Sequence, residues 1–233
     1  MLKKNKIVVT GGSGRFAQSL KRVKSQYKFV YPKKSALNIT NLNSIKKYLK
    51  KTRPTSVLHL AGLSRPMIEH EKNISKSINL NIIGTSNLVQ VCSLLKIKLI
   101  YFSTSYVYPG KKGNYKEYDA VLPWNNYAWS KLGGECAVHM YKNSLILRVC
   151  MTEKPFVHNS AFANVKLNFI FHDELSKILI KILNKKGIIN IGGPAKTVYN
   201  FAKKYYPKIR KILNKKNSSS GFPPNPFMNL SKL

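Results

Sequence analysis

Two residues of the segment 99–135 have a spacing that could support acid–base chemistry. Tyr127 and Lys131 are four positions apart on a predicted helix, so the phenol and the ammonium share one helix face. A nearby cation stabilises phenolate and lowers the pKa of tyrosine from its reference of about 10. We therefore expect Tyr127 to exchange a proton with a substrate oxygen near neutral pH. Thr104, which follows an apolar strand predicted over 99–102, could hydrogen-bond the same oxygen.

A glycine-rich turn near the start of the chain predicts a dinucleotide site. An apolar strand over 6–10 is followed at once by the turn and then by a helix to about residue 24. Glycines there permit a tight turn and close approach of a pyrophosphate, and the helix N-terminus offers free N–H groups. The residues of this turn are Gly11, Gly12, Gly14, Arg15, Phe16 and Ala17.

The second predicted strand, over 29–31, bears on the choice of dinucleotide. A site for NAD normally has Asp or Glu near the end of this strand, where it binds the ribose 2′-hydroxyl. Here Lys33 and Lys34 follow instead, and either could pair with a 2′-phosphate. This favours NADP(H) over NAD(H).

Length and charge limit the classes of function. The chain has 233 residues, enough for one α/β domain with a modest appendage, and a net charge of +33 from 41 Lys and Arg against 8 Asp and Glu. Nucleic-acid binding is one interpretation of that charge. We consider it unlikely because the lysines are dispersed over the polar sides of amphipathic segments and no nucleic-acid motif is present.

Cysteine usage predicts a reducing compartment and no metal site, and hydropathy argues against a membrane span and a signal peptide. The three cysteines, Cys92, Cys136 and Cys150, lack metal or redox spacing, so we expect no metal site and a reduced, cytoplasmic protein. No apolar run is long enough to span a membrane, and the short run after the basic N-terminus is a first strand rather than a signal peptide.

Strands and helices alternate along the chain, which predicts a doubly wound parallel sheet of the Rossmann type. Further strands are expected over 56–60 and 144–149. Helices are expected from about 41 to 51 and from 69 to 95, the latter interrupted by Asn81 and Gly84. Asn81 is either exposed or bound to backbone or water inside the fold, and His59 is interpreted as structural.

The regular alternation of strands and helices changes after residue 150, which suggests that the chain has three parts. We predict a cofactor-binding domain over 1–150, a short C-terminal substrate region over 151–216 and an extended surface tail over 217–233. Within the second part, 152–164 is expected to be irregular. Helices are expected over 173–184 and 197–206, with a strand over 187–191 between them.

The order of these motifs resembles an extended short-chain dehydrogenase/reductase, more narrowly the branch of dTDP-4-dehydrorhamnose reductases and sugar-nucleotide epimerases. The segments that carry the resemblance are 10–17, 37–41, 59–62, 81–85, 102–110, 127–135 and 189–193. The resemblance implies that Thr104 polarises the substrate carbonyl, that Tyr127 exchanges the proton, and that Lys131 holds the nicotinamide ribose and lowers the pKa of Tyr127. It further places Gly11, Gly14 and Ala17 at the pyrophosphate, Asn38 and Ile39 near the adenine, and Ala61 and Gly62 along the cofactor.

The resemblance also supplies a substrate class and leaves alternatives open. It implies reduction of a nucleotide-linked 4-keto-6-deoxy sugar, with a 4-epimerase or a non-catalytic cofactor-binding subunit as alternatives, and a possible homodimer. Family dehydratases carry an Asp–Glu pair after the strand-end Thr, and reductases usually carry Asp there. This chain has Ser105 and Tyr106, so sugar dehydration is unlikely. The stretch after Val149 is shorter than is typical, so the sugar pocket could be small, open or completed by another chain.

Overall fold

Six parallel strands form the central sheet of the computed structural model, which describes residues 5–156, 158–214 and 222–233. Their order across the sheet is β10-β5-β4-β3-β1-β2, and each neighbouring pair is parallel. The predicted Rossmann-type sheet is therefore confirmed. The strands are β1 (Lys6–Thr10), β2 (Lys28–Val30), β3 (Ser56–His59), β4 (Lys98–Thr104), β5 (Ser144–Val149) and β10 (Gly187–Ile191).

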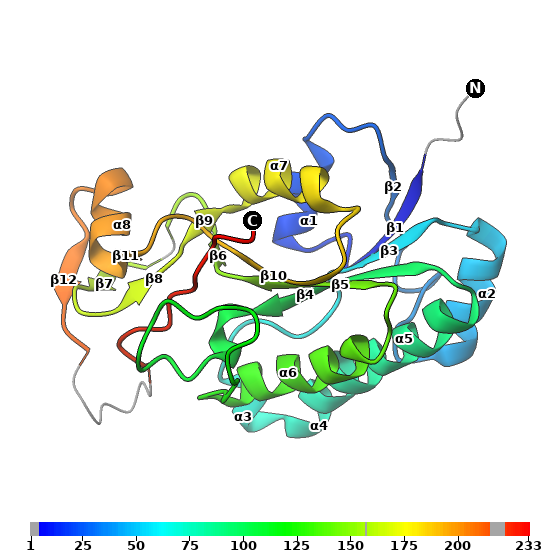
Figure 1. Ribbon diagram of the computed structural model, residues 1–233, viewed down its shortest axis with the longest axis horizontal. Helices are drawn as coiled ribbons and strands as arrows, with labels where there is room; N and C mark the ends of the chain where they lie inside the picture. Colours follow the sequence, from blue (N-terminus) through cyan, green and yellow to red (C-terminus); the bar gives the residue numbers. More distant parts are fainter. Residues whose placement is uncertain (1–4, 157, 215–221) are drawn as a thin grey trace.

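Helices cover both faces of this sheet (Figure 1). Helices α1 (Arg15–Lys21) and α7 (His172–Ile182) pack together on one face. Helices α2 (Leu42–Thr52), α5 (Gly84–Leu94) and α6 (Asn126–His139) lie on the other. Because both faces are covered, the strands bury apolar side chains on both sides: in β4, Ile100 belongs to the core beneath α1 and α7, whereas Leu99 belongs to the opposite core.

The segment predicted as one helix over 69–95 is divided into four pieces. These are α3 (Glu69–Lys72), α4 (Ile74–Ser77), the π-helix η1 (Ile78–Ile83) and α5. The prediction of one long helix was wrong, although the π-helix includes Asn81 and ends before Gly84, the two positions expected to interrupt it. The wider π turns change the direction in which side chains project, and this is often a feature of functional sites.

The region after residue 150 adds to the sheet and also forms a small lobe. Strand β10 and helix α7 belong to the main layers, while helix α8 (Val198–Tyr205) lies in the lobe (Figure 1). The prediction that 152–164 is irregular was wrong in part, because β7 lies inside it. The short strands are β6 (Met151–Thr152), β7 (Ser160–Phe162), β8 (Lys166–Leu167), β9 (Ile170–Phe171), β11 (Lys196–Thr197) and β12 (Arg210–Ile212).

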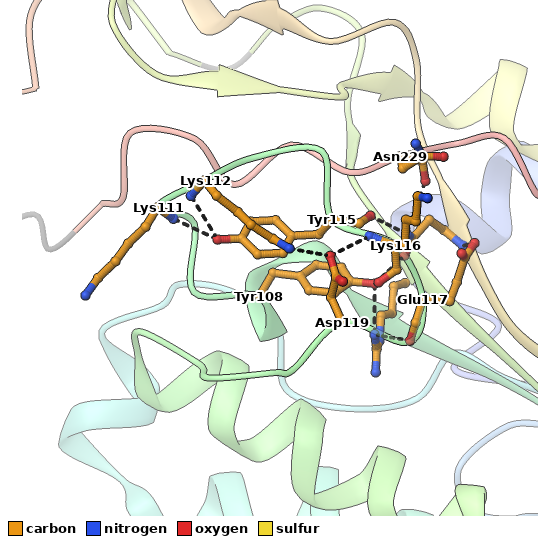
Figure 2. Close-up of polar contacts among 10 residues, drawn as sticks. Tyr108, Lys111, Lys112, Tyr115, Lys116, Glu117, Asp119 and Asn229 are labelled. Carbon is orange, nitrogen blue, oxygen red and sulfur yellow. Dashed lines mark hydrogen bonds and ion pairs between the residues drawn. The ribbon is translucent and has the colours of Figure 1, made fainter.

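The C-terminal residues 222–233 pack against the loop 108–119 instead of lying extended on the surface (Figure 2). The backbone N–H of Asn229 donates to the carbonyl of Tyr115 at 2.8 Å, and Tyr115 donates back to the carbonyl of Phe227 at 3.2 Å. Met228 is 2% exposed. The predicted surface tail was therefore wrong for these residues, because Met228 completes the apolar core of the lobe. The start of the predicted tail, residues 217–221, lies outside the described residues.

Candidate active site

One cavity lies at the carboxyl ends of the sheet strands and gathers most of the predicted site residues. Parallel strands all end at the same edge of a sheet, so the loops after β1, β3, β4 and β5 meet there. The predicted residues that line the cavity are Gly11, Gly14, Arg15, Phe16, Ala17, Ala61, Gly62, Thr104, Tyr127 and Lys131. The predicted nucleotide-binding and proton-transfer groups therefore share one site.

The glycine turn brings the loop after β1 against the loop after β3. Gly11 has φ of +71°, which favours glycine, and a β-carbon there would lie 2.7 Å from the backbone nitrogen of Ala61. The backbone N–H of Gly14 donates to the carbonyl of Gly11 at 2.9 Å and closes the turn. Helix α1 then begins at Arg15, without a side-chain cap at Gly14. Its first N–H groups are therefore free to meet a ligand.

The position of helix α6 is fixed by a side-chain cap at its first turn and by two glycines that lie close to η1. Asn125 caps the helix by accepting a hydrogen bond from the backbone N–H of Ala128 at 2.8 Å. A β-carbon at Gly134 would lie 2.6 Å from the carbonyl oxygen of Asn81, and one at Gly133 would lie 2.8 Å from Ile82. The two glycines therefore let α6 pack directly on η1, which fixes the first turns that carry Tyr127.

Asn81 connects this helix to the loop after β3. It is 1% exposed, so the buried alternative for this residue is confirmed. Its side-chain nitrogen donates to the Ser130 hydroxyl at 2.8 Å and to the Leu63 carbonyl at 2.9 Å, and its oxygen accepts from the backbone N–H of Leu63 at 2.7 Å. Asn81 thereby ties the residue before Lys131 to the residue after Gly62.

The phenol of Tyr127 lies in an aromatic surround. The centre of its ring is 5.2 Å from that of His70 and 6.2 Å from that of Tyr106. Burial raises the pKa of Tyr127 above its ordinary value and outweighs the hydrogen bond with Thr104 and the charge of Arg65, which both act to lower it. The expectation of a lowered pKa was therefore wrong for this state of the chain. With its pKa raised, the half-buried phenol carries its proton at neutral pH.

Lys131 lies on the same helix face as Tyr127, and its ammonium contacts strand β4. Its Nζ is 4.1 Å from the centre of the Tyr101 ring, within reach of a cation–π interaction. Burial lowers the pKa of Lys131 to about 7, although the carboxylate of Glu135 acts to raise it. The ammonium of Lys131 thus contacts the buried aromatic ring of β4, and its support of a Tyr127 phenolate stays a prediction.

Thr104 ends strand β4 and faces the cavity. Its side chain is buried, and its hydroxyl accepts a hydrogen bond from the backbone N–H of Tyr106 at 3.3 Å. That contact starts the short 3₁₀ helix η2 (Ser105–Val107), so the strand end and the following turn hold the hydroxyl in place. Ser105 and Tyr106, which stand where family members carry acids, also line the cavity.

Three residues predicted to bind the cofactor, Lys33 from its charge and two others from the resemblance, do not line this cavity. Lys33 is exposed in the loop after β2. The side chain of Asn38 accepts hydrogen bonds from the backbone and the hydroxyl of Thr40, at 3.2 and 2.9 Å. Ile39 is buried beneath Gly84, where a β-carbon would lie 2.8 Å from it. Their roles at the 2′-phosphate and the adenine stay predictions.

The structure agrees with a structural role for His59. Its ring is buried, and its two nitrogens lie 2.8 Å from the Thr10 hydroxyl and 3.0 Å from the Thr85 hydroxyl. Burial, together with the charge of Lys131, lowers the pKa of His59 to about 3. The ring is therefore neutral and spans the sheet between β1 and α5.

Sequence reasoning missed several residues of the cavity wall, among them three with ionisable side chains. Arg65 lies in the loop after β3, Glu153 follows β6, and His172 begins α7. Burial lowers the pKa of His172, and its ring packs edge-on against Phe16 at 5.8 Å. One signal was available for Glu153: the chain has only 8 acidic residues, so each carboxylate merited attention.

The described residues show no feature of a metal site or of a membrane span. Among residues 5–156, 158–214 and 222–233, no group of three or more His, Cys, Asp and Glu side chains could hold a metal ion. Nor does any helix in these ranges have the length and apolar character needed to cross a membrane.

Three comparisons place the chain among known proteins. The family model for the RmlD substrate binding domain matches residues 5–160. The dTDP-4-dehydrorhamnose reductase of Aggregatibacter actinomycetemcomitans is 25% identical over 199 residues, 81% of this chain and 62% of that protein. The methionine adenosyltransferase 2 subunit beta of Pongo abelii is 27% identical over 143 residues, 57% of this chain and 42% of that protein. The chain thus spans less than two thirds of either relative.

A solved structure extends the likeness over nearly the whole chain. The dTDP-4-dehydrorhamnose reductase of Bacillus anthracis in complex with NADP has a TM-score of 0.88. The match covers 99% of this chain and 92% of that one at 21% sequence identity. At this identity the likeness is one of fold, and it includes the C-terminal lobe.

Proposed function

The chain belongs to the RmlD substrate binding domain family, and on this premise we propose that it is an NAD(P)H-dependent reductase of a nucleotide-linked 4-keto-6-deoxy sugar. One observation carries the proposal. Thr104, Tyr127 and Lys131 line the same cavity as the glycine turn, so a dinucleotide bound over that turn would lie within reach of the proton-transfer groups.

The residues of the cavity fit a dinucleotide. Backbone approaches backbone closely at Gly11 and Ala61, so this wall offers peptide groups rather than side chains to a flat ligand. Arg15 and Arg65 add positive charge at the same cavity. A reduced nicotinamide bound there would supply the hydride for reduction of a carbonyl carbon.

The chain's own residues would then handle the carbonyl oxygen. Tyr127 would donate its phenolic proton to that oxygen, and the Thr104 hydroxyl would donate a second hydrogen bond that stabilises the developing negative charge. The raised pKa of Tyr127 ensures that the proton is present at neutral pH. Lys131 would bind the ribose next to the reacting carbon and support the phenolate as the proton leaves.

The preference for NADP(H) is part of the proposal. Lys33 and Lys34 are both exposed in the loop after β2, where a 2′-phosphate would meet positive charge instead of a carboxylate. NADP in the Bacillus anthracis structure supports this choice. Binding titrations with NADPH and NADH, compared between wild type and a Lys33→Ala, Lys34→Ala double variant, would test it. The variant should lose affinity for NADPH only.

The reaction is tested by NADPH oxidation with a panel of dTDP-, UDP-, GDP- and CDP-linked 4-keto-6-deoxy sugars. Tyr127→Phe should abolish turnover while NADPH binding is retained. Tyr118→Phe is the matched control, because Tyr118 is 79% exposed and does not line the cavity. Turnover that survives in Tyr127→Phe would overturn the mechanism. Tightly retained NAD with interconversion of sugar epimers would instead assign the chain to the 4-epimerases.

A second candidate is a non-catalytic cofactor-binding subunit. The likeness to proteins named as a subunit of methionine adenosyltransferase 2 favours it. It predicts NADP(H) binding without turnover of any sugar nucleotide, and recovery of the chain in a stable complex with another protein. Purification from its native cells, followed by mass spectrometry, separates this candidate from the reductase.

We also propose a homodimer formed through helix α6 and the segment that packs on it. Trp129 is 49% exposed on α6 and Met140, directly after this helix, is 86% exposed, while Ile74 and Ile78 are exposed on α4 and at the start of η1. Large apolar side chains gathered on neighbouring helices are typical of an interface. Light scattering on wild type and Trp129→Glu would test this, with a shift to monomer expected in the variant.

Action in the cytoplasm and the absence of nucleic-acid binding stay predictions.

A further inference from the structure

The carboxylate of Glu153 joins two arginines at the wall of the cavity. Arg15 Nη1 lies 2.7 Å from one carboxylate oxygen, and Arg65 Nη1 lies 2.8 Å from the other. Arg15 follows the glycine turn directly, Arg65 lies in the loop after β3, and Glu153 follows β6. Three segments far apart in the chain therefore meet at one acidic side chain, and all three side chains line the cavity.

The two arginines keep the carboxyl group of Glu153 ionised. Burial acts to raise its pKa, but the hydrogen bond and charge of Arg65 and the charge of Arg15 hold the pKa below its ordinary value. The Glu153 side chain is 13% exposed, whereas those of Arg15 and Arg65 are 56% and 38% exposed. The carboxylate thus faces inward, while both guanidinium groups remain accessible to a ligand.

The position of this carboxylate is unfavourable for a bound diphosphate. Each negative charge of the ligand would be repelled by Glu153, and the two arginines that could attract it are already paired. Guanidinium groups bind phosphate with short, charge-assisted and often bidentate hydrogen bonds. Each arginine contacts Glu153 through a single nitrogen, so exchange for a phosphate would break one short contact per arginine.

We propose that Glu153 competes with the diphosphate of the dinucleotide for Arg15 and Arg65. In the ligand-free chain it neutralises part of their charge. When the diphosphate binds over the glycine turn, the arginines turn to it and release Glu153. Glu153 thereby weakens dinucleotide binding and favours release of the oxidised product. This inference rests on the proposed cofactor binding.

A different role for Glu153 makes the opposite prediction. If its carboxylate held the two arginines in the positions that bind phosphate, removing it would weaken dinucleotide binding. Under competition, removing it ends the repulsion and frees both guanidinium groups, and both effects strengthen binding. The sign of the change in affinity therefore decides between the two roles.

The experiment is a fluorescence titration of NADPH against wild type, Glu153→Gln and Glu153→Ala at low ionic strength. The glutamine variant keeps the shape of the side chain, and the alanine variant removes its oxygens altogether. Asp119→Asn is the matched control, because Asp119 forms a 3.0 Å ion pair with Lys112, is 17% exposed and does not line the cavity. Thermal melting of each variant without ligand checks that it is folded.

We expect both Glu153 variants to bind NADPH about five- to tenfold more tightly than wild type, since each partly exposed ion pair is worth a few-fold in affinity. Asp119→Asn should bind as wild type does. Unchanged or weaker binding in both Glu153 variants overturns the competition, even when wild type binds NADPH well. The competition would also be overturned if the Glu153 variants gained affinity for dTDP, in a parallel titration, but not for NADPH. Glu153 would then oppose binding of the sugar nucleotide and not of the dinucleotide. Absence of dinucleotide binding in wild type overturns both this inference and the proposed function.

Discussion

The ammonium of Lys131 lies 4.1 Å from the centre of the Tyr101 ring, and the Tyr101 hydroxyl donates a hydrogen bond to the backbone carbonyl of Lys131 at 2.9 Å. Strand β4 therefore holds both ends of this lysine. The contact orients the ammonium of the residue that the resemblance assigns to Tyr127 and to the nicotinamide ribose.

The first prediction concerns the pH dependence of stability. Folding lowers the pKa of Lys131 from its ordinary value of 10.5 to about 7. Between these values the unfolded chain binds a proton that the folded chain does not, so this group makes stability rise with pH. Below pH 7 Lys131 is charged in both the folded and the unfolded chain. The full free-energy cost of burying its charge therefore lowers the stability there. Lys131→Met should therefore raise the unfolding free energy most at acidic pH.

Urea unfolding at pH 6 and pH 9.5 measures this effect. Lys131→Met should be more stable than wild type by about 1–2 kcal/mol at pH 6, with a smaller difference at pH 9.5. Lys46→Met, an exposed change of the same charge on α2, should show no such narrowing. A difference for Lys131→Met that does not depend on pH would contradict the assignment.

The second prediction separates the roles of Thr104. Thr104→Val keeps the shape of this buried side chain but removes the hydroxyl that we propose as a donor to the substrate oxygen. Turnover should fall about 100-fold, because a donor to a developing oxyanion is lost, while NADPH affinity is unchanged. Thr104→Ser should recover most of the activity. Steady-state kinetics of both variants provide the test, and equal losses in the two would rule out a role for the hydroxyl.

The third prediction concerns a buried ion pair behind the site. Arg148 Nε donates to the carboxylate of Glu135 at 3.0 Å, and Arg148 Nη1 donates to the hydroxyl of Tyr108 at 2.8 Å. Glu135→Gln should cost about 3–5 kcal/mol of unfolding free energy, because it leaves a buried guanidinium without its counter-charge. The double change Glu135→Leu, Arg148→Met should cost less than the single change, as measured by urea unfolding. A larger cost in the double variant would refute this account.

The fourth prediction tests the C-terminal segment. Met228 is buried in the core of the lobe, so Met228→Ala should cost about 2–5 kcal/mol of unfolding free energy. Leu233→Ala is the control, since Leu233 is 37% exposed and a surface change there should remain within about 0.5 kcal/mol. If the two variants melted alike, residues 222–233 would contribute little to the fold.

Several features followed from the sequence alone. Apolar strand segments, glycine turns and helical patterns are local, so they predicted the parallel sheet, the turn at Gly11 and the pairing of Tyr127 with Lys131 on one helix face. Because the carboxyl ends of parallel strands must meet at one edge, the parallel topology brings Thr104 near the glycine turn. The cavity contains these residues together.

Other features depended on contacts between distant segments. Burial raises the pKa of Tyr127, and burial cannot be inferred from a spacing of four. The contact of the Lys131 ammonium with Tyr101 likewise depends on the fold. Glu153 pairs with Arg15 and Arg65, and its pair with Arg15 joins residues 138 positions apart (153 minus 15). The C-terminal segment looked like a surface tail because its prolines and polar residues lack periodicity. Only the tertiary structure supplied the apolar lobe in which Met228 is buried.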